Sequence, residues 1–286
     1  MVVSPHDVID PSATVRLKLD SRPESLTVVR SMLAGLGEAL TFDAELLDDL
    51  KTAVSEACNN VVLHAYGGVA GPLSVCLEIG QGGLEVTVRD RGTGIQYVAS
   101  SAEDRMGVGL AVISALADRA EFLSAPDGGT EVRMAFLDRA APVDLLGATA
   151  QTILGPPAGL SGDVIVTLTP VGLLAGVLGR VARALAAAAR FSLDRFSDVY
   201  LVTDALDAHA QSAASGADVS FAIAAGTRRL EITIGPFREG SGACLRSAAV
   251  ARQSGSPLGM LADELTIQQG RAGEMLRLVV CDDRRY

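Results

Sequence analysis

The feature that most constrains this chain is a series of sequence blocks that recurs in the same order in its two halves. The matching blocks are residues 15–19 with 164–168, Phe42–Asp49 with Phe191–Asp198, Leu84–Val88 with Leu230–Ile234, and Leu116–Asp118 with Leu261–Asp263. The spacing between partners shrinks slowly along the chain, as expected after duplication and small loop deletions. We therefore predict two copies of one fold; the alternative is chance similarity between short aliphatic segments.

The first copy alternates between strand and helix patterns. Residues 15–19 show the two-residue period of a strand, whereas residues 23–40 and 43–61 place apolar side chains at helical spacing. Hairpin patterns follow at 75–88 and 121–136, with a helical pattern at 109–119 between them. These elements predict an α+β sandwich, in which helices cover one face of a mixed, mostly antiparallel sheet.

The chain is long enough for two domains, and its composition locates the boundary between them. Residues 140–162 are rich in Ala, Gly and Pro, as is typical of an inter-domain connection. The predicted division is a first domain at 12–138, a linker at 139–162 and a second domain at 163–286. With 286 residues, each domain has an ordinary size.

Charge and cysteine content narrow the class of protein. The net charge of −10 disfavours a nucleic-acid partner, because phosphate binding requires clustered Lys and Arg. The four cysteines show no CxxC spacing, which predicts free thiols without zinc. No apolar signal-peptide core is found at the start, and the apolar stretch at 171–189 is interrupted by Gly and Arg, so we expect a cytoplasmic protein without a membrane partner.

Three segments of the first copy carry the residues suited to chemistry. Glu56 and Asn60 are four residues apart on the second helix, so they share one face. Asp90 ends a strand and is followed by Gly92 and Gly94, whose small size allows the backbone to approach a ligand. The third segment, Gly107-Val108-Gly109-Leu110, leads into a helix, whose N-terminus favours an anion. Each pattern alone also occurs in ordinary loops and solvated helix faces.

Together these motifs resemble the GHKL ATPases, the superfamily with the Bergerat ATP-binding fold. Glu56-x-x-x-Asn60 is similar to its N box, Asp90-x-Gly92-x-Gly94 to its first glycine box, and Gly107-x-Gly109-Leu110 to its second. The amino-acid sequence of residues 52–66 most resembles that of the anti-sigma factor serine/threonine-protein kinases. The resemblance covers residues 14–137 and implies a Bergerat-type sandwich there. Together with the repeated blocks, it predicts two tandem sandwiches of this type, the second of them degenerate.

The resemblance assigns roles around ATP and Mg²⁺. It implies that Asn60 coordinates the Mg²⁺ that bridges the phosphates, with possible help from Asn59, and that Glu56 is the general base for the incoming hydroxyl. It further implies that Asp90 reads adenine, with Thr130 near the same end, and that Arg105 faces the γ-phosphate or a partner protein; Arg105 as a plain surface residue is the alternative. His64 is expected to pack at the helix end, and Cys58 to be a small buried residue. The remaining cofactor-binding positions implied are Gly92, Gly94, Gly107, Val108, Gly109 and Leu110.

The second copy has lost these groups. The block offsets align Glu56 with Ala205, Asn60 with His209, Asp90 with Pro236, Gly107 with Arg252 and Thr130 with Glu274. A Gly- and Ser-rich insertion at 238–257 takes the place of the second glycine box. We therefore expect no nucleotide in the second copy; an unrelated regulatory domain is the alternative.

Three functions remain open at this stage. The resemblance favours a kinase that phosphorylates an anti-anti-sigma (STAS) protein and sequesters a sigma factor. A non-catalytic ATP-dependent module that exchanges regulatory protein partners is the alternative, and Glu56 favours catalysis because a pure nucleotide sensor has less need of a base. A sensor-kinase catalytic domain is disfavoured, since no helix with a phospho-acceptor histidine precedes the motifs. The halves are expected to form a pseudo-dimer within the chain, or the chain a homodimer.

Overall fold

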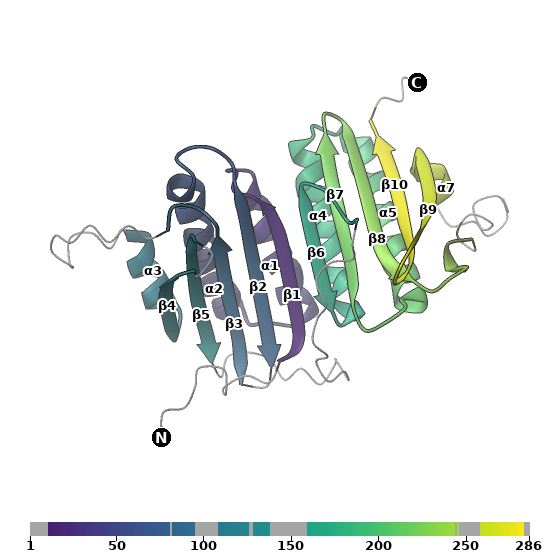
Figure 1. Cartoon of the computed structure of the whole chain (residues 1–286). Helices are drawn as coiled ribbons and strands as arrows, with labels where there is room; N and C mark the ends of the chain where they lie inside the picture. The colour runs from purple at the N-terminus through teal and green to yellow at the C-terminus, as the bar shows by residue number, and fades with distance from the viewer. Residues whose placement is uncertain are drawn as a thin grey trace. The chain divides into compact units, whose positions relative to one another are not determined.

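The computed structural model describes residues 11–80, 82–94, 108–125, 128–137, 159–243, 245 and 258–282. The chain divides into two compact units, residues 1–151 and 152–286. The elements of the first unit are β1 (Pro11–Asp20), α1 (Ser25–Ala39), α2 (Ala44–Asn60), η2 (Val61–Ala65), β2 (Pro72–Gly80), β3 (Gly83–Asp90), α3 (Val108–Leu116), β4 (Arg119–Ser124) and β5 (Thr130–Leu137) (Figure 1). Those of the second are β6 (Val164–Thr169), η3 (Val171–Leu173), α4 (Leu174–Ala188), α5 (Leu193–Ala213), β7 (Val219–Gly226), β8 (Arg229–Phe237), α7 (Leu258–Leu261), β9 (Glu264–Gly270) and β10 (Gly273–Cys281).

Both units contain the same arrangement of five strands. The order is β4-β5-β3-β2-β1 in the first unit and β9-β10-β8-β7-β6 in the second. Every neighbouring pair described within a unit runs antiparallel, so the α+β class is confirmed, while the expected mixed sheet is wholly antiparallel in these pairs. In each unit two long helices, α1 with α2 or α4 with α5, lie on one face of the sheet (Figure 1).

The turn between the two long helices is built in the same way in both units. Thr41 and Arg190 adopt left-handed backbone conformations, with φ of 53° and 61°. The next helix then begins at a polar cap. The side chains of Asp43 and Ser192 each accept a hydrogen bond from the backbone N–H three residues later. Equivalent caps support the interpretation of a duplicated fold.

In both units an aspartate just before the last hairpin binds the end of the second strand of that hairpin. Asp118 donates its N–H to the carbonyl of Ala135 at 2.9 Å, and its carboxylate accepts the N–H of Leu137 at 2.8 Å. Asp263 makes both bonds again on strand β10, at 2.8 and 2.7 Å. Leu116–Asp118 and Leu261–Asp263 therefore resemble each other because each aspartate anchors the same strand.

Helix α4 and the turn before it form a strongly apolar stretch. By length and composition the stretch Val171–Ala188, with a mean hydropathy of 1.6, would be sufficient to cross a membrane, and 44% of it is buried inside the protein. The glycines within it do not break the helix. Val177, Leu178 and Val181 are buried, as expected of a core helix.

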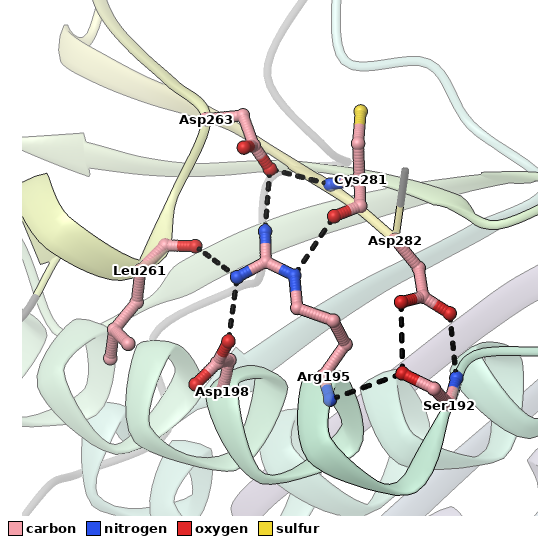
Figure 2. A network of polar contacts seen from close by, with 7 residues as sticks. All are labelled: Ser192, Arg195, Asp198, Leu261, Asp263, Cys281 and Asp282. Carbon is pink, nitrogen blue, oxygen red and sulfur yellow. Dashed lines mark hydrogen bonds and ion pairs between the residues drawn. The ribbon is translucent and has the colours of Figure 1, made fainter. Parts of the chain in front are cut away.

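The second unit differs from the first in a buried arginine at the start of α5. Arg195 is only 6% exposed. Its guanidinium binds Asp198 and Asp263, each at 2.6 Å, and donates to the carbonyls of Leu261 at 3.1 Å and Cys281 at 2.8 Å (Figure 2). The network joins α5 to the segments before β9 and at the end of β10. At the corresponding place in α2 stands Leu46, which is fully buried.

A neighbouring carboxylate strengthens the same junction. Asp282 accepts hydrogen bonds from the backbone N–H of Ser192 at 2.7 Å and from its hydroxyl at 2.9 Å (Figure 2). It also pairs with Arg228 at 3.0 Å. Burial opposes ionisation of Asp282, but the donors at Ser192 and Arg228 outweigh it and lower its pKa. The start of α5 is therefore attached to the chain after β10.

We predict that Arg195→Ala destabilises the second unit by about 3–5 kcal/mol, because it removes the partner of two carboxylates at a buried junction. Urea unfolding followed by circular dichroism measures the loss. The matched control is Arg229→Ala, whose side chain is 42% exposed and pairs with Glu231 at 3.1 Å. This control is expected to change stability by at most about 1 kcal/mol. Equal losses in the two variants would contradict a structural role specific to Arg195.

Candidate functional site

Glu56 and Asn60 lie together on α2 beneath the first turn of α3. A Cβ built on Gly109 would lie 3.0 Å from Glu56 Oε2 and 3.4 Å from Asn60 Oδ1. Both polar side chains are half-buried. The backbone at the start of α3 therefore approaches an acid and an amide that stand on one helix face, and a Cβ at position 109 would touch the ends of both side chains.

The helix that carries these two residues changes its geometry immediately after Asn60. Asp43 caps its start by accepting the N–H of Leu46 at 2.8 Å. Residues Val61–Ala65 then form a π-helical turn. Such a turn accommodates one additional residue within a helix and is frequent at functional sites. The corresponding helix α5 runs without one to Ala213.

Asp90 closes strand β3 and begins the loop that contacts the end of this π turn. The residue is 2% exposed, and its Oδ1 accepts the N–H of Gly92 at 2.7 Å. Thr93 donates its N–H to the carbonyl of Ala65 at 3.0 Å. A Cβ on Gly92 would lie 2.1 Å from that same carbonyl oxygen. Glycine is thus required at position 92 for the loop to lie against the helix.

The start of β5 completes this side of the site. Gly129 has a φ of 86°, and a Cβ there would lie 2.3 Å from the carbonyl oxygen of Asp90. Gly94, with a φ of 75°, faces the carbonyl of Gly129. Thr130 follows Gly129 directly. The structure therefore brings Asp90, Gly92, Gly94 and Thr130 together at the end of the helix that carries Glu56 and Asn60.

Tyr66 also belongs to the candidate site, although the sequence motifs did not identify it as a site residue. Its hydroxyl accepts the N–H of Arg91 at 2.8 Å and donates to the carbonyl of Pro72 at 2.6 Å. Burial is the main cause that raises the pKa of Tyr66; the Arg91 N–H opposes this shift and the charge of Asp90 adds to it. The phenol therefore stays protonated and joins the Asp90 loop to the start of β2. Its position in the His64-Ala65-Tyr66 segment is the signal that could have identified it.

Arg30 is a second residue that the sequence did not reveal. Its Nε donates to the hydroxyl of Ser55 at 2.8 Å, although the two residues are far apart in the chain. Ser55 is 3% exposed and precedes Glu56. The contact links α1 to the segment of α2 that carries the acid.

The remaining residues named from the sequence differ in how deeply the structure buries them. Cys58 is fully buried, as expected, and burial raises its pKa to about 12, so the thiol is unreactive. His64 is exposed in the π turn rather than packed. Val108 is 83% exposed, while Asn59 and Leu110 are half-buried. Arg105 and Gly107 lie outside the described residues.

The residues present fit a magnesium-bound nucleotide. Mg²⁺ binds oxygen, usually through one or two protein ligands together with phosphate oxygens and water. Asn60 and Glu56 offer such oxygens beside the backbone of Gly109. In the part of the chain that the structure describes, no group of three or more His, Cys, Asp or Glu gathers into a metal site. A metal here would therefore depend on Asn60 and on the phosphates themselves.

Comparison with known proteins identifies the first unit. Residues 19–136 match the family model described as "Histidine kinase-like ATPase domain". The "Anti-sigma F factor" of Caldanaerobacter subterraneus is 32% identical over 129 residues, which cover 42% of this chain and 90% of the relative. The "Serine-protein kinase RsbW" of Bacillus pumilus is 30% identical over 141 residues, or 44% of this chain and 86% of the relative.

The region of similarity contains all the site residues described above. A further relative, the "Anti-sigma F factor" of Clostridium acetobutylicum, is 29% identical over 129 residues, again 42% of this chain and 90% of the relative. The resemblance inferred from the motifs is thereby confirmed for the first half of the chain. Through residues 19–136 this chain belongs to the histidine kinase-like ATPase domain family and is a distant relative of the anti-sigma factors and RsbW serine-protein kinases.

Proposed function

We propose that the first unit is a serine/threonine-protein kinase that transfers the γ-phosphoryl group of ATP to an anti-anti-sigma protein of the STAS class, and that it sequesters a sigma factor. The observation that supports this most directly is the placement of Glu56 and Asn60 beside Gly109, within 3.0 and 3.4 Å of a Cβ there. A carboxylate next to a magnesium-binding amide, under the backbone of a glycine-rich segment, suits transfer of a phosphoryl group to a hydroxyl. The names of the relatives support the choice of partners.

In this mechanism the residues of the chain position the reactants and move one proton. Asn60 would hold Mg²⁺, which would neutralise negative charge on the phosphates. Glu56 takes the proton of the serine or threonine hydroxyl as its oxygen bonds to the γ-phosphorus. The bond from that phosphorus to the β–γ bridging oxygen breaks, and ADP leaves. Arg105 is proposed to balance charge on the transferred group or to contact the partner.

The adenine end is assigned to the second cluster of residues. Asp90 Oδ1 accepts the N–H of Gly92. Because an ionised carboxylate has about four acceptor positions, Asp90 can also accept a hydrogen bond from the adenine amino group. Gly92 and Gly94 allow the backbone to pass the base, and Thr130 bonds at the same end. Gly107, Val108, Gly109 and Leu110 cover the phosphates, with Asn59 assisting. We place the kinase and its partners in the cytoplasm.

The second candidate function is an ATP-dependent module that exchanges protein partners without phosphoryl transfer. It requires Asn60 and Asp90 to hold the nucleotide, and partner exchange through a change of conformation. The acid beside Gly109 favours the kinase, because a nucleotide sensor has no reaction for a base to assist. Incubation with ATP, Mg²⁺ and candidate STAS proteins separates the two functions, since only the kinase leaves phosphate on the partner.

We predict that Glu56→Gln lowers the rate of phosphoryl transfer by roughly 10²–10⁴, because it removes the general base while retaining size and hydrogen bonding. Single-turnover transfer from γ-labelled ATP to a STAS protein measures the rate, and calorimetry measures nucleotide affinity, which should stay within about threefold since the phosphate and adenine contacts remain. Glu45→Gln changes an exposed acid in the first turn of the same helix and serves as control. Unchanged transfer in Glu56→Gln would exclude the assigned role.

We predict that Tyr66→Phe weakens ATP binding about 3- to 10-fold, because the Asp90 loop loses the hydroxyl that accepts the N–H of Arg91. The rate of transfer at saturating ATP should change little, since Glu56 and Asn60 are untouched. Calorimetry and saturation kinetics measure the two effects. Tyr200→Phe removes the hydroxyl of a half-exposed tyrosine in the second unit and should leave both quantities unchanged. A fall in the saturated rate alone would contradict a role in positioning the loop.

A further inference from the structure

The segment after β8 in the second unit also contains two glycines, but it lacks the acid that precedes the glycines of the first unit. Gly92-Thr93-Gly94 is a non-helical loop, whereas the backbone after β8 becomes helical from Ser241. Each segment is attached to the end of the second long helix through a different residue. Ala213 accepts the N–H of Arg238, directly after β8, at 2.8 Å, and Ala65 accepts that of Thr93, three residues after β3. The place of the loop is therefore shared by the two units, but its local conformation is not.

A glycine before the last strand establishes which residues correspond. A Cβ on Gly129 would lie 2.3 Å from the carbonyl oxygen of Asp90, and a Cβ on Gly273 would lie 2.3 Å from that of Phe237. Both glycines have positive φ. Phe237, and not Pro236 as the block offsets suggested, therefore corresponds to Asp90, because a register shift between Glu274 and Leu276 displaces the alignment by one residue. Glu274 corresponds to Thr130, as expected.

The carboxylate of Glu274 is bound by the loop itself. It accepts the backbone N–H of Gly240 at 2.7 Å and of Gly242 at 2.9 Å, and a third bond from Gln269 at 3.1 Å. The residue is only 4% exposed. The two backbone donors are the main reason that its pKa is lowered. Gly240 immediately precedes a helical segment and Gly242 lies in its first turn, so Glu274 satisfies N–H groups that a helix start leaves unpaired, from within the chain.

Two rings pack against each other near Glu274. The imidazole of His209 packs edge-on against Phe237, with ring centroids 4.8 Å apart. Burial lowers the pKa of His209, and the nearby charge of Glu274 opposes this shift only in part. Its Nε2 is buried and has no hydrogen-bond partner within the described structure. In the first unit the equivalent positions hold Asn60 and Asp90, which are proposed to face the nucleotide.

We propose that Glu274 is a built-in ligand of the second unit, which fixes the Gly240–Gly242 segment without any nucleotide. Glu274, His209 and Phe237 stand at the positions that Thr130, Asn60 and Asp90 hold in the first unit, so side chains of the chain itself fill this copy of the site. The chain then contains one exchangeable nucleotide site and one permanently filled copy of it. This last consequence rests on the nucleotide site proposed for the first unit, whereas the role of Glu274 does not.

The direct test is amide hydrogen exchange in Glu274→Gln. The amides of Gly240 and Gly242 should exchange roughly 10- to 100-fold faster, because hydrogen bonds to a charged acceptor are lost while the size of the side chain is kept. Glu239→Gln removes the same charge from an exposed residue of the same loop and should leave both amides unchanged. Equal exchange in Glu274→Gln and the wild type, or equal acceleration in the control, would overturn the proposal.

Nucleotide stoichiometry tests the consequence. Calorimetric titration of the wild-type chain with MgATP should give one site per chain, and Asp90→Asn, which alters only the first unit, should give none. Two sites in the wild type, or one site remaining in Asp90→Asn, would overturn the built-in ligand. A wild-type chain that binds no MgATP would instead contradict the function proposed for the first unit, and the exchange result would still decide the role of Glu274.

Discussion

The contact between Gly92 and Ala65 is the constraint on which the candidate site depends. A Cβ at position 92 would lie 2.1 Å from the Ala65 carbonyl oxygen, so any side chain would separate the loop after β3 from the end of the helix. That contact joins two groups of residues with different origins. Asp90 comes from the sheet, and Glu56 with Asn60 from α2. The π turn, Val61–Ala65, lies between Asn60 and the carbonyl that the loop contacts, so both groups of residues lie at one end of the helix.

The two units show which features belong to the fold and which to the chemistry. Helix caps, the left-handed turn before the second long helix, and the aspartate that anchors the last hairpin are present in both. The residues proposed to act on a nucleotide are present only in the first. Since the shared features stabilise the backbone by local hydrogen bonds, the second unit could lose its ligand-facing side chains without losing its architecture.

Sequence patterns predicted most of this arrangement, and the exceptions have physical explanations. Helix and strand periods identified the elements, and the glycines marked positions where the backbone makes close contacts, as Gly92 and Gly109 do. Tyr66 and Arg30 were missed because their contacts, with Arg91 and Ser55, join distant parts of the chain. The match of Asp90 with Pro236 was wrong because a β-bulge is not visible in a sequence offset. Hydrophobic periodicity likewise could not predict that the sheets are antiparallel, because it shows which face of a strand is buried and not the direction of the strand.

The second unit replaces apolar or neutral residues of the first with buried charges at two places, and each charge is fully engaged. Arg195 stands where Leu46 is buried, and it binds two carboxylates and two carbonyls. Glu274 stands where Thr130 begins β5, and it binds two backbone N–H groups and an amide. Removing a buried charge is costly only when its partners remain, so each substitution makes its surroundings dependent on it. For Glu274 those surroundings are the Gly240–Gly242 segment, and an acceptor on the same chain cannot be diluted away or exchanged. In the proposal made for Glu274, the second copy therefore keeps this segment bound at any nucleotide concentration, whereas the site proposed in the first unit depends on its nucleotide.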